Sequence, residues 1–251
     1  MVGNRTESVV GASTNNFQFS NGGKVQRHAN LISKASLSLL PEHKDQIKEF
    51  QSIYRENQSL YREVEQKTQI PSVLIAALHF RESKGNFRTY LHQGDPLGRA
   101  PVNHPTNIPT FHNWTDSAIH ALGMKKSTQN KLGINASTND LSLLAEYAET
   151  YNGKGYENRG LVTPYVYSGT SVYSGGKFVA DGKFNSSTID KQVGILPLIM
   201  SVSNGDFKNL AGNTNSTLNS QNQDSFSSTL SQVRFEQPTL NTNGFNQPAS
   251  A

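Results

Sequence analysis

Cysteine is absent from the 251 residues of this chain, and hydrophobic residues make up only 34% of them. The missing cysteine excludes disulfide bonds, cysteine-containing zinc sites and catalysis by a thiol. The apolar content is too low for the whole chain to pack, but it suffices for one domain of roughly 150 residues. We therefore expect one folded domain accompanied by polar segments.

Long apolar runs and clusters of like charge are also missing. The longest apolar runs, 73–78 and 193–200, fall far short of the roughly 20 residues that span a bilayer. The first residues lack the apolar core of a secretory signal. The net charge is +4, but lysine and arginine form no run of five. We expect no membrane span, no signal peptide and no nucleic-acid partner.

The distribution of residue types divides the chain into three parts. Residues 1–40 are rich in Asn, Ser and Gly and lack an apolar face, which predicts an extended or disordered polar extension. Residues 205–251 are dominated by Asn, Ser, Thr and Gln, which predicts a disordered tail. Residues 41–204 carry the periodic apolar patterns, and we expect them to form a mainly α domain.

Two helices are predicted in the first half of this domain. Apolar residues at spacings of three and four predict one amphipathic helix over 43–67. Pro71 and the apolar run after it predict a second, buried helix that ends at Gly85. Glu82 therefore falls in the last turn of a helix that is anchored in the core.

The second half is predicted to alternate between loops and helices. Residues 86–113 contain many prolines and glycines and should form an irregular loop. Helix caps are expected at 115–116 and 138–140, and a final helix over 187–203. Residues 153–183 contain short alternating pieces, which predict a small hairpin or ordered loops.

Glu82 is the candidate for catalytic chemistry on physical grounds. The partial negative charge at the C-terminus of a helix disfavours ionisation of a carboxyl group there. A raised carboxyl pKa is what a glycosidase needs to protonate a poor leaving oxygen near neutral pH. The spacing alone favours a different interpretation, a surface Glu paired with Arg81, Lys84 or Arg88.

Several separated segments resemble peptidoglycan hydrolases of the lysozyme-like superfamily, which includes goose-type lysozymes and lytic transglycosylases. Arg81 to Phe87 resembles their catalytic Glu-Ser helix end, and Tyr151 to Tyr156 resembles their Tyr-Asn-Gly turn. Phage and bacterial muralytic enzymes of this superfamily share further segments, which correspond to Leu91 to Leu97, Trp114 to Ala118, Thr163 to Gly169 and Lys177 to Gly182. The resemblance covers about residues 43 to 203.

The resemblance implies a lysozyme-like fold that cleaves the glycan strands of bacterial peptidoglycan at the MurNAc–GlcNAc bond. The enzyme would be a muramidase or a lytic transglycosylase with Glu82 as its general acid. Asp95 is the candidate second carboxylate, although an Asp before a proline is also typical of a turn. Without a second carboxylate, Glu82 acts as acid and then base while a substrate group attacks intramolecularly.

The predicted substrate-binding residues extend over four segments. Tyr151 is expected to donate a hydrogen bond to the Glu82 carboxyl, and Asn152 to bind an acetamido group. Exposed tyrosines are expected to stack on sugar rings, with loop packing as the competing interpretation. The full set of candidates is Ser83, His92, Tyr151, Asn152, Tyr156, Tyr165 and Tyr167.

Two histidine patterns offer alternatives. His112, Asp116 and His120 are spaced by four and form a candidate metal site. The helix is expected to begin after Asn113-Trp114, which would remove His112 from the shared face, so no metal is predicted. His79, one turn before Glu82, either modulates the Glu82 pKa or is a core histidine.

These expectations combine into one function with two alternatives. No cofactor is implied, and the partner is peptidoglycan. The lack of a signal peptide fits a phage endolysin or virion-associated lysin, carried to the bacterial cell wall by the phage or exported by another route. The polar tails would then dock onto virion or tail proteins. The alternatives are a non-catalytic structural virion or glycan-binding protein with the same fold, and a chitinase.

Overall fold

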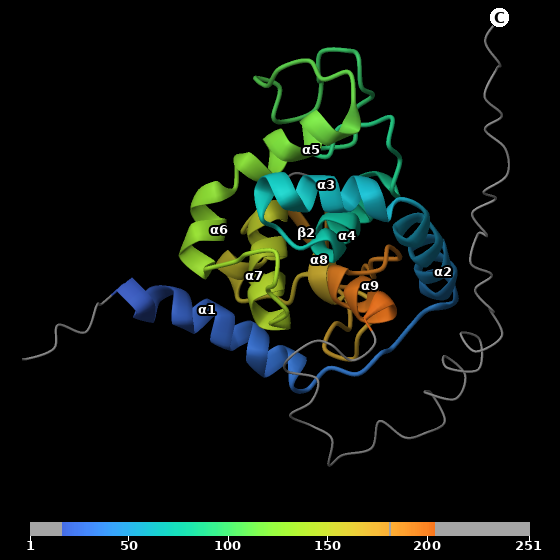
Figure 1. Ribbon diagram of the computed structural model, residues 1–251. Helices are drawn as coiled ribbons and strands as arrows, with labels where there is room; N and C mark the ends of the chain where they lie inside the picture. Colours follow the sequence, from blue (N-terminus) through green and yellow to red (C-terminus); the bar gives the residue numbers. More distant parts are fainter. Residues whose placement is uncertain (1–16, 181, 204–251) are drawn as a thin grey trace, which may run out of the picture. The chain divides into compact units, whose positions relative to one another are not determined.

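The computed structural model describes residues 17–180 and 182–203, which form a mainly helical domain with a two-stranded sheet (Figure 1). This confirms the predicted mainly α class with a small hairpin. None of the helices in these residues is long and apolar enough to cross a membrane. In chain order the elements are α1 Phe17–Ile32, α2 Pro41–Glu56, α3 Gln58–Thr68, α4 Ser72–Ser83, α5 Trp114–Gly123, α6 Lys126–Leu132, α7 Leu141–Asn152, the short 3-10 helix η1 Glu157–Arg159, α8 Pro164–Tyr167, β1 Lys177–Ala180, β2 Lys183–Asn185 and α9 Ile195–Val202.

Helix α4 lies in the core, as the apolar run after Pro71 predicts. Every residue from 74 to 80 is buried, and α2, α3 and α9 pack against the helix. Burying one Leu or Ile side chain contributes about 1.5–3 kcal/mol. Leu74, Ile75 and Leu78 therefore hold α4 firmly and fix the position of Glu82 in its last turn.

The predicted helix over 43–67 is two helices rather than one. Helix α2 ends and α3 begins at Asn57, whose φ of −116° and ψ of 23° are not helical. The Asn57 side chain donates to the carbonyl of Ile53 at 2.9 Å and so closes α2. The apolar stripe runs on through the break, because Ile47 and Phe50 of α2 and Tyr61 of α3 are all buried. Apolar spacing alone did not reveal the interruption.

The prediction of an extended segment over residues 1–40 is wrong for helix α1. This helix packs against α7, and its residues His28 and Ile32 are buried. Its sequence has no continuous apolar stripe, because a buried histidine with ionic partners takes the place of an apolar contact. The folded domain therefore begins earlier than residue 41. Residues 1–16 and the predicted tail over 205–251 lie outside the described residues.

The middle of the chain follows the prediction except at α6. Residues 86–113 form an irregular loop, as expected. The cap of α5 is Asn113, two or three residues before the predicted position, and its side chain accepts from the backbone N–H of Asp116. Asp140 caps α7 as predicted. Helix α6 is mostly polar and was not predicted, because it has no apolar periodicity.

The final helix is shorter than the predicted 187–203 and begins only at Ile195. The residues before it follow an irregular path, because the Arg81 guanidinium donates hydrogen bonds to the carbonyls of Gln192 and Val193. Gly194 lies so close to α8 that an added Cβ would come within 2.4 Å of the Val166 carbonyl oxygen. Only glycine fits at that approach, and the helix starts directly after it.

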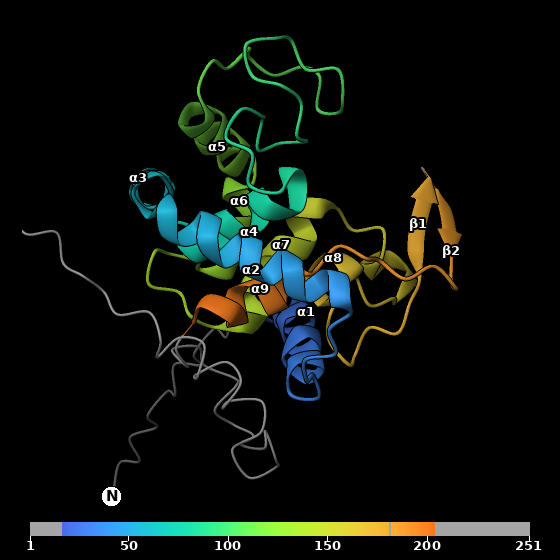
Figure 2. The same cartoon turned by 90° about the vertical axis from the view of Figure 1, so that its right-hand side faces the viewer.

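The region 153–183 contains the predicted hairpin and one short helix that was not predicted. Strands β1 and β2 are antiparallel, with Phe178 opposite Phe184, and Figure 2 shows them at one side of the helices. The alternating piece 164–167 forms the helical turn α8 instead of a strand, with Pro164 at its first position. Proline there has a suitable φ and no missing hydrogen bond.

Candidate functional site

Glu82 sits at a tightly fixed helix end. Helix α4 stops because Lys84 and then Gly85 take left-handed conformations, with φ of 53° and 72°. A Cβ at Gly85 would come within 2.9 Å of Ile53, so this turn needs glycine for space as well as for its backbone angle. The Gln192 side chain donates to the free carbonyl of Arg81 at 2.7 Å. The backbone around Glu82 is thus held from two sides.

The Glu82 carboxyl has a neutral partner. The Tyr165 hydroxyl donates to Glu82 Oε1 at 2.8 Å. Burial raises the pKa of Glu82 to about 7, while the Tyr165 hydrogen bond and the charge of Arg81 lower it in part. Within residues 17–180 and 182–203, Glu82 forms no ion pair, so the alternative of a surface Glu paired with Arg81, Lys84 or Arg88 is wrong.

Arg81, the nearest cation, is turned toward a different carboxylate. Its guanidinium lies 3.1 Å from Asp190 Oδ2, and Lys177 Nζ lies 2.8 Å from Asp190 Oδ1. Burial works against ionisation of Asp190, but Arg81 first and then Lys177 outweigh it and lower the pKa of Asp190. Arg81 also packs over the Tyr165 ring, 4.9 Å from its centroid. Asp190 therefore pairs with Arg81, and Arg81 acts on Glu82 through its charge without forming an ion pair with it.

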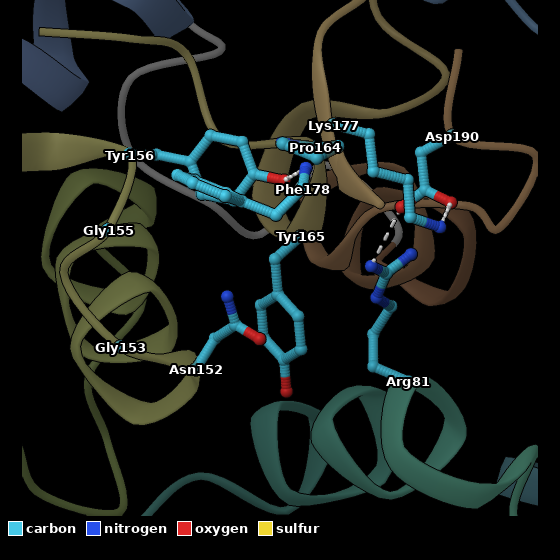
Figure 3. Close-up of a pocket in the computed structure, with 10 residues that line it drawn as sticks. All are labelled: Arg81, Asn152, Gly153, Gly155, Tyr156, Pro164, Tyr165, Lys177, Phe178 and Asp190. Atoms are coloured by element: carbon cyan, nitrogen blue, oxygen red, sulfur yellow. Dashed lines mark hydrogen bonds and ion pairs between the residues drawn. The ribbon is translucent and has the colours of Figure 1, made fainter. Parts of the chain in front are cut away.

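Arg81, Tyr165, Lys177 and Asp190 border a pocket of about 330 Å³, whose lining does not include Glu82 itself (Figure 3). Figure 3 shows the Tyr165 ring beside Asn152, with its hydroxyl pointing toward α4. Tyr165 thus joins the pocket to the Glu82 carboxyl. The residues that line it come from α4, the end of α7, α8, β1 and the segment before α9: Arg81, Asn152, Gly153, Gly155, Tyr156, Pro164, Tyr165, Lys177, Phe178 and Asp190.

Tyr151 lies close to Glu82 but does not make the predicted hydrogen bond. Its hydroxyl donates instead to the Leu91 carbonyl at 2.9 Å. Burial, followed by the nearby Glu82 carboxylate, raises the pKa of Tyr151 well above its usual value. The hydrogen bond predicted for Tyr151 belongs to Tyr165, which α8 brings to the carboxyl from a later part of the chain.

The loop 86–113 packs on the end of α4. An added Cβ at Gly94 would lie 3.0 Å from the Glu82 carbonyl oxygen, and the φ of Gly94 is +77°. Asp95 organises this loop: its carboxylate accepts from the backbone N–H groups of Val102 and Asn103 at 2.8 and 2.9 Å. It also accepts from the side chains of Asn103 and Gln93.

Asp95 is therefore wrongly placed as a second catalytic carboxylate. Burial works against its ionisation, but the hydrogen bonds from Asn103 and Val102 outweigh burial and lower its pKa. Both Asp95 oxygens are taken by donors of its own loop. The competing interpretation, a residue that holds a turn before Pro96, agrees with this geometry.

Two predicted substrate-binding residues, Ser83 and His92, lie outside the pocket lining. The Ser83 hydroxyl donates to the His79 carbonyl at 3.4 Å. His92 Nε2 lies 2.9 Å from His120 Nδ1, and burial lowers the pKa of His92 to about 4. His120 is thus engaged by His92, and His112 precedes the N-cap of α5, so the described chain does not bring His112, Asp116 and His120 together as a metal site.

The remaining tyrosine predictions divide between pocket and core. Tyr156 and Tyr165 line the pocket but are buried, not exposed as predicted, and the Tyr156 hydroxyl accepts from the Phe178 backbone N–H at 3.0 Å. Tyr167 has no exposed surface, and its hydroxyl lies 2.6 Å from His28 Nδ1, so a role in stacking on substrate is wrong. His79 is a core histidine, bonded to Tyr61 at 3.0 Å, and burial lowers its pKa to about 4.

Sequence reasoning missed the charged half of the pocket. Arg81 and Lys177 lie within segments that carry the family resemblance, but nothing in their spacing assigned them to a site. No sequence pattern marked Asp190 as a site residue. Its ion pair with Arg81 joins residues 109 positions apart, and its ion pair with Lys177 follows no regular spacing. Phe178 was visible only as part of an alternating piece.

A comparison of the chain with protein-family models, with curated proteins and with solved structures found no match.

Proposed function

We propose that this protein is a glycosidase that cleaves the glycan strands of bacterial peptidoglycan, with Glu82 as its general acid. The observation that carries the proposal is a carboxyl group with a pKa of about 7, held by the neutral donor Tyr165 next to a pocket. A general acid works best when its pKa lies near the working pH. The segments that resemble muralytic enzymes give the substrate class.

The pocket suits one saccharide unit beside the reacting bond. Its volume of about 330 Å³ falls at the lower end of the range of small-ligand sites. The aromatic rings of Tyr156 and Phe178 lie edge to face, 4.9 Å apart, and form an apolar wall suited to a sugar face. The exposed Asn152 amide can donate to and accept from an acetamido group.

The reaction that fits this geometry uses one carboxyl group. Asp190 is neutralised by Arg81 and Lys177, and Asp95 is bound within its loop. Protonated Glu82 gives its proton to the leaving glycosidic oxygen and becomes a carboxylate. That carboxylate then takes a proton from the group that attacks the sugar carbon, either water or the 6-hydroxyl of the substrate. The second case yields a 1,6-anhydro end and is the transglycosylase route.

The decisive experiment compares the full chain with Glu82→Gln on purified peptidoglycan. Loss of a general acid lowers the rate by about 10²–10⁴-fold, and we expect that loss for Glu82→Gln. Glu56→Gln, at an exposed position on α2, is the matched control and should keep full activity. Mass analysis of the released fragments then separates reducing ends from 1,6-anhydro ends.

Three results would overturn the proposal or change its substrate. Equal clearing by wild type and Glu82→Gln would remove Glu82 from the mechanism. Clearing by neither, combined with sedimentation of both on peptidoglycan, would identify a non-catalytic glycan-binding protein. Release of fragments from chitin but not from peptidoglycan would keep Glu82 as the acid and change the substrate to chitin.

A further inference from the structure

A second group of buried ionisable side chains lies between α1 and α7. His28 of α1 has no exposed surface, and Glu146 and Glu149 of α7 are 4% and 1% exposed. His28 Nε2 lies 3.3 Å from Glu146 Oε2 and 3.1 Å from Glu149 Oε2. The other ring nitrogen, Nδ1, lies 2.6 Å from the Tyr167 hydroxyl of α8. Three helices thus meet at one imidazole ring.

His28 Nε2 lies near both carboxylates but forms a hydrogen bond with neither. His28 Nε2 makes no hydrogen bond of acceptable geometry, although both Glu oxygens are within 3.3 Å. Glu149 Oε1 is buried and also lacks a hydrogen-bond partner among the described residues. Buried polar atoms nearly always have partners, so a group that lies between these atoms is needed to satisfy them.

The distances match those between ligands of one metal ion. A tetrahedral ion with bonds of about 2.0–2.2 Å to nitrogen and oxygen separates its ligand atoms by about 3.4 Å. The two measured separations from His28 Nε2 are 3.3 and 3.1 Å. A neutral His28 that donates Nδ1–H to Tyr167 presents the lone pair of Nε2 to the gap, as metal-binding histidines do.

The charges at this place also require a cation. Two buried carboxylates face one guanidinium, that of Arg27, whose Nη1 donates to Glu149 Oε2 at 2.8 Å. The second guanidinium nitrogen, Nη2, is used by the Leu161 carbonyl at 2.6 Å. Lys24 and Lys154 attract Glu146 but pair with Glu157, so no cation among the described residues contacts Glu146 if His28 is neutral, and an unpaired buried carboxylate is costly. Either a proton on His28 or a metal ion supplies the missing positive charge.

We propose that His28, Glu146 and Glu149 bind a divalent transition-metal ion, with Zn²⁺ as the representative, and that the ion fastens α1 to α7. Three protein ligands of one nitrogen and two oxygens suit zinc, with water as the fourth. The site has a structural consequence for the pocket. Helix α7 also carries Tyr151 and Asn152, and Tyr167 is two residues from Tyr165 on α8. The inference does not depend on glycosidase activity.

The test uses the untagged full chain, stripped of metal and titrated with Co²⁺ and Zn²⁺. We expect one Co²⁺ per chain with the visible absorption of a four-coordinate site, displaced by Zn²⁺, and a rise of the thermal unfolding midpoint with added Zn²⁺. Loss of a group that only supports a ligand weakens metal binding by about 10- to 100-fold. Loss of a ligand itself, in Glu146→Gln or Glu149→Gln, should weaken it at least as much.

The neighbouring histidine pair provides the matched control. His92 and His120 lie 2.9 Å apart and are another place where zinc could bind weakly. His120→Gln should leave the stoichiometry and the Co²⁺ spectrum unchanged. The proposal is overturned if wild type binds no stoichiometric Co²⁺, in which case a protonated His28 alone compensates the carboxylates. It is also overturned if His120→Gln abolishes binding while both Glu variants retain it.

Discussion

The carboxyl groups of Asp190 and Glu82, which lie at and next to the same pocket, have partners of different charge and pKa values shifted in opposite directions. Arg81 and Glu82 are adjacent in sequence, yet Arg81 pairs with Asp190 whereas Glu82 takes a hydrogen bond from Tyr165. The pKa of Asp190 is lowered, chiefly by Arg81 against the effect of burial, while burial raises the pKa of Glu82 to about 7. The difference arises from the partner that each carboxyl has.

This contrast is the pattern that acid catalysis needs. When neighbouring ionisable groups have pKa values pushed apart, one stays charged and the other keeps a proton for transfer. Asp190 stays charged because Arg81 and Lys177 pair with it, whereas burial raises the pKa of Glu82 to about 7 although the charge of Arg81 still lowers it in part.

Removal of Arg81, the buried one of the two cations that pair with Asp190, should lower the stability most. Arg81 is 6% exposed and Asp190 is 2% exposed, and breaking a buried ion pair costs about 3–5 kcal/mol. Arg81→Gln should lower the free energy of unfolding by that amount in a urea titration at pH 7. Lys177, the outer partner of the same carboxylate, is 40% exposed, and Lys177→Gln should cost under about 1 kcal/mol. An equal loss of unfolding free energy in Arg81→Gln and Lys177→Gln would contradict the assignment of Arg81 as the buried partner and Lys177 as the exposed one.

Glu82 should cost the protein stability at high pH. The usual pKa of Glu82 is 4.5, and its pKa in the folded protein is about 7. Between pH 4.5 and pH 7 the Glu82 carboxyl is therefore ionised in the unfolded chain but protonated in the folded protein. Stability is therefore lost as the pH rises from 4.5 to 7 and stays reduced above 7. Glu82→Gln cannot ionise and should be more stable than wild type by about 3 kcal/mol at pH 8. The two proteins should be equally stable at pH 4, and a less stable variant at pH 8 would contradict the raised pKa.

Loss of the Tyr165 hydroxyl should change the pH dependence of activity. The hydrogen bond from Tyr165 lowers the pKa of Glu82, so Tyr165→Phe should raise it. In the proposed mechanism the activity requires protonated Glu82 and falls as the pH rises through its pKa, so the alkaline limb of the profile should move to higher pH. A hydrogen bond to a charged group contributes about 1.5 kcal/mol, and the maximal rate should fall about tenfold with the loss of orientation. If the alkaline limb stays at the same pH in Tyr165→Phe, Tyr165 does not set the pKa of Glu82.

Tyr151→Phe should have the smallest effect and sharpens the comparison of the two tyrosines. The Tyr151 hydroxyl donates to the Leu91 carbonyl and makes no hydrogen bond to Glu82. Its loss should lower the free energy of unfolding by about 1 kcal/mol and leave the alkaline limb where it is. A shift of that limb as large as in Tyr165→Phe would show that Tyr151 acts on the carboxyl directly.

The sequence by itself determined the elements that depend on local chemistry. The apolar run after Pro71 required a buried helix, and Gly85 marked its end, because glycine adopts a left-handed backbone without steric cost. The cap at Asp140 and the irregular loop over 86–113 follow from equally local preferences. The position of Glu82 in the last turn of α4 was therefore predictable without any knowledge of the fold.

Only the tertiary structure decided which groups meet Glu82 and which do not. Tyr165 and Asp190 reach α4 from parts of the chain 83 and 109 residues away, and no spacing in the sequence reports such contacts. The same holds for α1, whose burial depends on Glu146 and Glu149 far along the chain. Periodicity records which face of a helix is apolar, but the pairing of buried charges depends on the packing of several helices at once.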